Sequence, residues 1–312
     1  MGTAVAETPA DMVAVPLDGL VGAEPLDFPL YLPTSQGRSV LYRDTKTTFD
    51  DGHLARLRQE GVERILIRAQ DRGGYSRRIE HDLDALLRNK NAPLVQRVEI
   101  LYGVATSVAD DLLRGSPSRE DMRRAEMLFA STATLVTRET KAQQAIRQML
   151  RASASLAQHS LTVGMLSLAL ARIVISSDVQ VLVRAGLAGL LHDIGRVGHS
   201  DAGADEDPDH PQRGFEALTA LGLAKEVCEA ALYHHERLDG RGYPRGIGGD
   251  RIPVFSRIVA IVDSFDSVYS QQRDSQPRVG VFDALKILAQ VYRGCFDDRL
   301  AVALVQLFAQ AR

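Results

Sequence analysis

Residues 234–244 read His-His-Glu-Arg-Leu-Asp-Gly-Arg-Gly-Tyr-Pro, and this stretch is the most specific signal in the second half of the chain. The two adjacent histidines end a predicted helix, and the glycine-rich segment after them is too irregular to continue it. Adjacent residues within a regular helix point about 100° apart and do not easily share one ligand. At a helix end the backbone is free to turn, so His234 and His235 can converge on adjacent metal ions.

A second pair of this kind lies upstream. His192 and Asp193 follow the apolar run 187–191 and precede Gly195, so they occupy the end of a buried helix. A carboxylate between two sets of imidazoles can bridge two cations about 3.5–4 Å apart, the spacing used for in-line displacement at phosphorus. His210 precedes a proline and marks the start of another helix.

Two further side chains complete the candidate cluster. His159 lies on an amphipathic helix, and Asp263 follows the apolar run 258–262, where a carboxylate is costly unless a charge compensates it. Taken singly, His159 can be a satisfied core histidine and Asp263 can cap a neighbouring helix, while His199 is interpreted as a surface residue. Taken together, the five histidines and two aspartates predict a dinuclear site. Imidazoles and carboxylates without thiolates suit iron, manganese, nickel or zinc.

The composition sets the class of protein. With 312 residues, 45% of them hydrophobic and 25% charged, the chain is typical of a soluble globular protein of about two domains. Aromatic residues are 5% and tryptophan is absent, which favours a Leu- and Ala-rich helical core. The net charge of −3 offers nucleic acid polymers no long-range attraction. Two cysteines, no apolar run long enough to span a membrane and no basic residue before Arg38 predict a cytoplasmic protein without a secretory signal.

The chain divides into four predicted parts. Residues 1–27, rich in Ala, Pro, Gly and Asp, predict a mobile tail. Residues 28–90 predict a small α/β or α+β regulatory domain. Residues 91–150 predict a helical linker, whose long and partly apolar helix favours pairing with a second copy of the chain. Residues 151–312 predict a compact all-helical domain, so the fold class is mainly α.

The predicted N-terminal domain contains no catalytic constellation and is interpreted as a scaffold or sensory cap. Arg72, Arg77 and Arg78 flank Tyr75, a pattern that fits a solvated loop better than an anion site. Its predicted elements are strands over 28–32, 39–42 and 62–68 and a helix over 51–60. Farther along the chain, the predicted helix N-caps are Ser118, Asp178 and Asp297, and Gly222 ends a helix.

Residues 234–244 match, without a gap, the HHExxDGxGYP signature of the HD-GYP subfamily of HD metal phosphohydrolases. His192-Asp193-Ile194-Gly195-Arg196 resembles the HD signature, and 210–214 (His-Pro-Gln-Arg-Gly) resembles the HPxxG element of that subfamily. Ile252-Pro253, Arg257-Ile258 and 263–266 resemble its IP…RI…DxxD helix. The resemblance covers about residues 150–312, while 28–90 only loosely resembles a small domain often found before HD-GYP domains.

The resemblance implies a helical bundle and a bacterial cyclic di-GMP phosphodiesterase that produces linear pGpG and GMP on two iron or manganese ions, other divalent transition metals being alternatives. It implies one metal held by His159, His192, Asp193 and Asp263, and a second held by Asp193, His210, His234 and His235. Asp193 and Arg196 are the implied catalytic residues, with cyclic di-GMP contacts from Arg196, Asp239, Gly242, Tyr243 and Arg257.

Four departures from the family pattern bear on these expectations. Arg196 stands where the family usually has lysine, so phosphate binding should survive with altered geometry. Ser155 replaces the glutamate that supplies a third metal in some members, so two metals are expected. Thr162 replaces the usual arginine, and 271–274 lacks the usual Arg- and Tyr-rich stretch. These changes affect expected substrate affinity more than metal binding.

Two alternatives to a cyclic di-GMP phosphodiesterase stay open. One is a signalling module of low turnover that binds nucleotide and docks partner proteins such as diguanylate cyclases through the loop at Tyr243. The other is an HD hydrolase that acts on another nucleotide or cyclic dinucleotide. Neither alternative predicts membrane insertion or a nucleic acid polymer as partner, and a homodimer is compatible with each of them.

Overall fold

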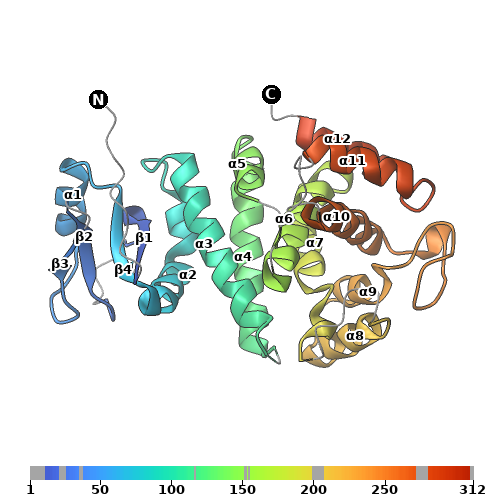
Figure 1. The fold of residues 1–312 in the computed structure, drawn as a ribbon, viewed down its shortest axis with the longest axis horizontal. Coiled ribbons are helices and arrows are strands. Elements are labelled where there is room, and N and C mark those ends of the chain that lie inside the picture. Colours follow the sequence, from blue (N-terminus) through green and yellow to red (C-terminus); the bar gives the residue numbers. More distant parts are fainter. Residues whose placement is uncertain are drawn as a thin grey trace. The chain divides into compact units, whose positions relative to one another are not determined.

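The computed structural model describes residues 11–20, 26–34, 38–115, 117–150, 153, 155–198, 207–271 and 280–309. The chain divides into two compact units after Ser107, within helix α3 (Leu94–Leu112). The described part is mainly helical, with one small sheet near the N-terminus (Figure 1). The predicted fold class is therefore confirmed. No helix in this part of the chain is both long and apolar enough to cross a bilayer.

The first unit contains a four-stranded antiparallel sheet in the order β1-β4-β2-β3. In strand β4 (Arg64–Arg68), the consecutive residues Ile65, Leu66 and Ile67 are all buried. Because neighbouring side chains of a strand point to opposite faces, both faces of β4 are covered. The predicted strands are confirmed with slightly different ends. The sheet comprises β1 (Met12–Pro16), β2 (Leu30–Pro33), β3 (Ser39–Arg43) and β4 (Arg64–Arg68).

Strand β1 lies in a region that was predicted to be a mobile tail. Residues 1–27 were expected to be a mobile tail, yet Met12–Pro16 pair residue by residue with β4, and the short helix η1 (Leu17–Gly19) follows. The tail prediction is wrong for this stretch, because its partner strand lies about fifty residues later and local composition does not reveal it. Residues 1–10 and 21–25 lie outside the described residues.

Helices α1 (Asp51–Gln59) and α2 (Arg72–Arg88) complete the secondary structure before α3, together with the short helix η2 (Ala69–Asp71). The predicted solvated loop around Tyr75 is instead the first part of α2. The Tyr75 ring is buried, and its hydroxyl donates a hydrogen bond to the Pro16 carbonyl oxygen at 3.0 Å. Burial of Tyr75 and Ile79 along one side of the segment outweighs its two glycines and favours a helix.

The secondary structure of the second unit consists of helices joined by loops, within the residues that the structure describes. The predicted N-caps are confirmed: the Ser118 side chain forms a capping box with Asp121, and Asp178 accepts hydrogen bonds from the Gln180 and Val181 amides. Its elements are α4 (Arg119–Arg138), α5 (Ala142–Met149), α6 (Leu156–Val174), α7 (Val179–Leu191), η3 (Ile194–Arg196), α8 (His210–Leu221), α9 (Lys225–Tyr233), η5 (Gly249–Arg251), α10 (Val254–Gln271), α11 (Val281–Val291) and α12 (Asp298–Ala309).

Helices α6 and α7 form the centre of this unit. Most residues of both helices are buried, and in α6 the buried run is unbroken from Ser160 to Ala171, as expected for helices covered on most sides. Helices α4 and α9 pack on α7, while α10 and α12 pack on α6. The apolar stripe of α4, which includes Leu128 and Phe129, is thus covered within its own unit, and Phe129 fits against Gly186 of α7. Pairing of the 91–150 region with a second copy stays a prediction.

Candidate metal centre

The residues predicted to bind metal come together, most of them at the ends of α7, α8 and α9. His192 and Asp193 follow α7, His234 and His235 follow α9, and His210 begins α8. His159 lies in the first turn of α6, and Asp263 lies in the middle of α10. Each helix end leaves its last residues free to turn toward a common point, as predicted for the two adjacent pairs.

Asp193 lies between two groups of side chains. Potential ligand atoms of Asp193, His210, His234 and His235 all lie within 4.8 Å of one another. The Nε2 atoms of His210 and His234 are 3.1 and 3.6 Å from Asp193 Oδ1. This group corresponds to the predicted second metal site.

The other group is built on the opposite side of the same carboxylate. Potential ligand atoms of His159, His192 and Asp193 lie within 4.8 Å of one another, and His192 Nε2 is 3.5 Å from Asp193 Oδ2. Asp263 Oδ1 is 3.2 Å from His159 Nε2 and 3.9 Å from His192 Nε2. Asp193 is therefore common to both groups and directs one oxygen toward each, an arrangement that suits a carboxylate bridging two ions.

Backbone carbonyl groups orient three of the imidazoles. The Nδ1 atoms of His192, His210 and His234 each donate to the carbonyl oxygen three residues earlier, at 2.7, 2.6 and 2.9 Å. A carbonyl oxygen only accepts, so Nδ1 of each ring carries the hydrogen and Nε2 presents its lone pair to the cluster. This tautomer is the one that a metal site needs, and such second contacts hold a ligating imidazole in place.

The buried atoms of the cluster fit metal ions. Within the described part of the chain, His192 Nε2 and His235 Nε2 are buried and lack a hydrogen-bond partner, while Asp193 Oδ1 is buried close to His210, His234 and Arg196. Unpaired buried polar atoms are costly, and a cation between them would satisfy several at once. Imidazole nitrogens mixed with carboxylate oxygens are the donor set of iron, manganese, nickel or zinc sites. The residues thus fit divalent transition metals, while the number and identity of the ions stay predictions.

The electrostatics of His192 and His235 agree with this donor chemistry, whereas His159 would release a proton on binding a metal. Burial lowers the pKa of His192 to about 4 and that of His235 to about 2, so both rings are neutral at pH 7. Burial also acts against a charged His159, but hydrogen bonds to Asp263 and Asp266 outweigh it and raise its pKa to about 10. The same interaction with His159 holds the pKa of the Asp263 carboxyl below its usual range despite burial.

Asp266 is a residue of the centre to which the sequence reasoning gave no role. Its Oδ2 atom lies 2.7 Å from His159 Nδ1, so this carboxylate holds the imidazole from the side away from Asp263. Asp266 follows Asp263 by three residues on α10, one helical turn, and both are thus on the side of the helix that meets α6. The spacing of the two acids was the signal that could have identified it.

The 3-10 helix after Asp193 packs tightly on the start of α8. A Cβ atom placed on Gly195 would lie 2.1 Å from the His210 carbonyl oxygen and 2.6 Å from the Gly214 nitrogen. Only glycine permits this approach. The contact places Asp193 beside His210 and so brings together two members of the second group of candidate ligands.

The glycine-rich loop folds back on the end of α9. A Cβ atom on Gly242 would lie 2.4 Å from the His235 carbonyl oxygen, so glycine is required for the close approach. Glu236 is buried, and its Oε1 atom accepts a hydrogen bond from the Arg245 amide at 2.6 Å. The Tyr243 ring stacks on the His235 imidazole with centroids 4.6 Å apart. These contacts place Tyr243 at the edge of the metal centre.

The other predicted substrate contacts have partners of their own. Arg196 Nε is 2.8 Å from Asp193 Oδ1, so its guanidinium lies directly beside the cluster. Asp239 accepts hydrogen bonds from the Arg241 amide and the Arg237 guanidinium within the loop. Arg257 donates to the Ile252 carbonyl oxygen and is paired with Asp250. Contacts of these residues with substrate stay predictions.

The structure also locates two of the departures from the family pattern. Ser155 is the N-cap of α6, and its side chain accepts a hydrogen bond from the Gln158 amide. Thr162 is buried one turn after His159 on α6. His199 and residues 272–274 of the segment 271–274 lie outside the described residues.

Comparison with known proteins identifies relatives of the second unit. The family model described as an HD domain matches residues 140–300, just over half of the chain. A cyclic di-GMP phosphodiesterase of Pseudomonas aeruginosa is 36% identical over 161 residues, which span 47% of this chain and 38% of that protein. A 3'3'-cGAMP-specific phosphodiesterase of Vibrio cholerae is 34% identical over 128 residues, 38% of this chain and 28% of that protein.

A further relative and a solved structure extend the comparison. A cyclic di-GMP phosphodiesterase response regulator of Xanthomonas campestris is 34% identical over 140 residues, 40% of this chain and 36% of that protein. In these three relatives the match thus spans well under half of the relative's length. The solved structure of an HDG"Y"P protein from Bdellovibrio bacteriovorus has a TM-score of 0.67 at 18% identity, covering 96% of this chain and all of that one. At this identity the likeness concerns the fold.

Proposed function

Because this chain belongs to the HD domain family, and to its HD-GYP branch, we propose that it is a metal-dependent phosphodiesterase that hydrolyses cyclic di-GMP to linear pGpG and then GMP. One observation carries the proposal. Asp193 lies between two groups of buried imidazoles, with one oxygen near His192 and the other near His210 and His234. A bridged pair of divalent ions at this place is the arrangement used for in-line attack on a phosphodiester.

The protein's contribution to this reaction follows from the placement of its side chains. When bound, metal ions would supply Lewis acidity at the phosphate and lower the pKa of a nearby water. Asp193 would hold both ions, and His192, His210 and His234 would bind through Nε2, because Nδ1 of each ring donates to a backbone carbonyl oxygen. Arg196 provides a positive charge beside them, where negative charge grows on phosphate in the transition state. Tyr243 forms an aromatic wall for the substrate at the edge of the centre.

The experiment that tests this function uses the full chain purified without oxygen and loaded with Fe(II) or with Mn(II). Each preparation is incubated with cyclic di-GMP, and linear products are followed by chromatography. We expect pGpG to appear first and GMP later. Absence of products with both metals, in protein shown to contain them, would contradict the proposal and favour the alternative of a docking module, to which the Arg196 and Thr162 departures also point.

A second substrate, 3'3'-cGAMP, is a candidate because relatives at 34% and 32% identity carry the name of 3'3'-cGAMP-specific phosphodiesterases. The two cyclic dinucleotides share their phosphodiester linkages and differ in one base, so the metal centre alone does not distinguish them. The same assay with both substrates in competition measures the ratio of kcat/KM. A ratio that favours 3'3'-cGAMP would replace cyclic di-GMP as the proposed substrate.

Substitution of Tyr243 by alanine is expected to lower kcat/KM by about 10-fold, because stacking of a base on an aromatic ring contributes about 1–3 kcal/mol. Metal content is expected to stay unchanged, since Tyr243 stacks on His235 and is not one of the predicted metal ligands. Tyr243→Phe is the matched control and should retain most of kcat/KM. Loss of metal from Tyr243→Ala alone would show that the ring supports the centre and not the substrate.

Substitution of Arg196 by alanine is expected to lower kcat by about 100-fold or more, as found when a donor to a developing negative charge is removed. Metal content should persist, because the imidazoles and Asp193 stay in place. Arg196→Lys keeps the positive charge but not the forked geometry, so its kcat should lie between those of the wild type and the alanine variant. A kcat for Arg196→Ala equal to that of the wild type would exclude the guanidinium from the transition state.

A further inference from the structure

A cavity of about 220 Å³ lies behind the metal centre, among α5, α6, α10, α11 and α12. His159 separates this cavity from the centre: its Nε2 atom faces Asp263, while its Nδ1 atom is bound by Asp266, which lines the cavity. We call this cavity the aromatic pocket, because much of its wall is formed by the rings of Phe265, Tyr269, Phe282 and Phe308. The proposed hydrolysis assigns no role to this pocket.

Two buried groups of opposite charge line the aromatic pocket. Arg147 of α5 is only 9% exposed, and its guanidinium carbon lies 5.5 Å from the centroid of the Phe308 ring. Asp266 is 1% exposed. Within the described residues, one guanidinium nitrogen of Arg147 and the Oδ1 atom of Asp266 are buried without a hydrogen-bond partner. Such atoms cost about 1–3 kcal/mol each when unpaired, so the pocket is matched to a ligand that pairs with both.

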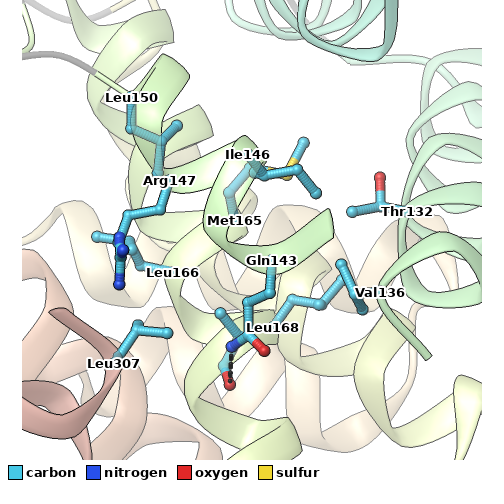
Figure 2. Close-up of a pocket in the computed structure, with 11 residues that line it drawn as sticks. Thr132, Val136, Gln143, Ile146, Arg147, Leu150, Met165, Leu166, Leu168 and Leu307 are labelled. Carbon is cyan, nitrogen blue, oxygen red and sulfur yellow. Dashed lines mark hydrogen bonds between the residues drawn. The ribbon is translucent and has the colours of Figure 1, made fainter. Parts of the chain in front are cut away.

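Small side chains and a neighbouring cavity leave room at this place. Thr162 forms part of the wall of the aromatic pocket, at a position where the family pattern has the much larger arginine. A second, smaller cavity of about 10 Å³ adjoins it between α4, α5 and α6 (Figure 2). Arg147, Leu150 and Leu166 line both cavities, and the Gln143 side chain closes the smaller one by donating to the Ala169 carbonyl oxygen at 3.1 Å.

We propose that the aromatic pocket binds a small aromatic carboxylate that also carries an N–H or O–H donor. The ring would stack among Phe265, Tyr269 and Phe308, and the carboxylate would pair with the Arg147 guanidinium, an interaction strengthened by burial. The donor group would satisfy Asp266 Oδ1. Ligand pockets are typically lined by apolar and aromatic side chains, with a few polar groups that fix the orientation of the ligand. The aromatic pocket has this composition. Binding of this ligand does not depend on the proposed hydrolysis of cyclic dinucleotides.

The absence of tryptophan provides a direct test. Indole-3-acetate has an aromatic ring, a carboxylate and an N–H donor, and its indole fluorescence can be excited where tyrosine does not absorb. Titration of the full chain into indole-3-acetate is expected to show saturable binding. Arg147→Met keeps the apolar stem but removes the charge, and it should weaken binding by about 10-fold or more, which corresponds to one charged hydrogen bond. Binding of indole, which lacks the carboxylate, should change less than twofold.

Controls separate loss of the site from loss of the fold. Arg138→Met makes the same change on an exposed residue of α4 and should leave the affinity for indole-3-acetate unchanged. The Phe282 side chain forms part of the pocket wall and is 54% exposed. The Phe282→Ala variant should therefore fold normally and should bind indole-3-acetate more weakly. The proposal is overturned if the wild type shows no saturable binding at millimolar indole-3-acetate. The proposal is also overturned if a folded Arg147→Met variant binds indole-3-acetate as tightly as the wild type does. If Arg147→Met does not fold, wild-type affinity in Phe282→Ala overturns the proposal instead.

Discussion

Replacement of Asp193 by asparagine is expected to abolish hydrolysis of cyclic dinucleotides and to remove most of the bound metal. Asp193 is the one carboxylate common to both groups of ligands among the described residues, so its loss weakens both metal positions together. An amide has nearly the same shape but no negative charge to bridge two cations. We expect kcat to fall by about 1,000-fold or more, since metal ions contribute several kcal/mol to such transition states. Metal analysis of the anaerobically purified variant and the product assay measure the two effects.

The matched control is Glu226→Gln, which makes the same change of charge on an exposed carboxylate of α9. This variant should keep its metal and its activity. Because asparagine is isosteric, the circular dichroism of Asp193→Asn should equal that of the wild type. Full metal content and normal turnover in Asp193→Asn would show that the bridging position is assigned to the wrong residue.

Replacement of Gly195 by alanine is expected to disrupt the centre without changing any ligand. The new Cβ atom would lie 2.1 Å from the His210 carbonyl oxygen. Because this oxygen is a backbone atom, the clash is relieved only if η3 and the start of α8 move apart. Overpacking of this kind costs about 1–3 kcal/mol or more. The movement would separate Asp193 from His210, which are 3.1 Å apart, so we expect a lower melting temperature and loss of metal from the second group.

Gly214 provides the control on the other side of the same contact. A Cβ atom on Gly214 would meet its nearest neighbours, the Gly195 nitrogen and an Ile194 methyl group, at 3.4 Å, which is ordinary van der Waals contact. Alanine also favours the interior of α8 over glycine. Gly214→Ala is therefore expected to fold and to bind metal as the wild type does. Equal metal content and melting temperature in Gly195→Ala and Gly214→Ala would refute the role given to the close approach.

The two substitutions separate two requirements of the site. Asp193→Asn tests the charge between the imidazoles while the backbone stays unchanged. Gly195→Ala tests the backbone arrangement while every ligand stays present. Their combined result distinguishes a failure of the ligand assignment from a failure of the packing that assembles the ligands.

Local sequence was sufficient to predict the helix ends at which the ligands lie. Helix caps depend on near neighbours, so Ser118 and Asp178 were identified correctly from short patterns. The orientation of three histidines is equally local, because each Nδ1 atom binds a carbonyl group three residues earlier. The family resemblance, carried by residues 234–244, then supplied the expected grouping of residues.

Contacts between segments that are distant in sequence could not be predicted and became visible only in the tertiary structure. Strand β1 exists because Met12–Pro16 pair with β4, and no pattern within the first 27 residues indicated that partner. Asp266 reaches His159 from a residue 107 positions away, and the aromatic pocket joins five helices. The physical reason is the same in each case: hydrogen bonding and capping act between neighbours in sequence, whereas burial and the pairing of buried polar groups depend on which surfaces the whole fold brings together.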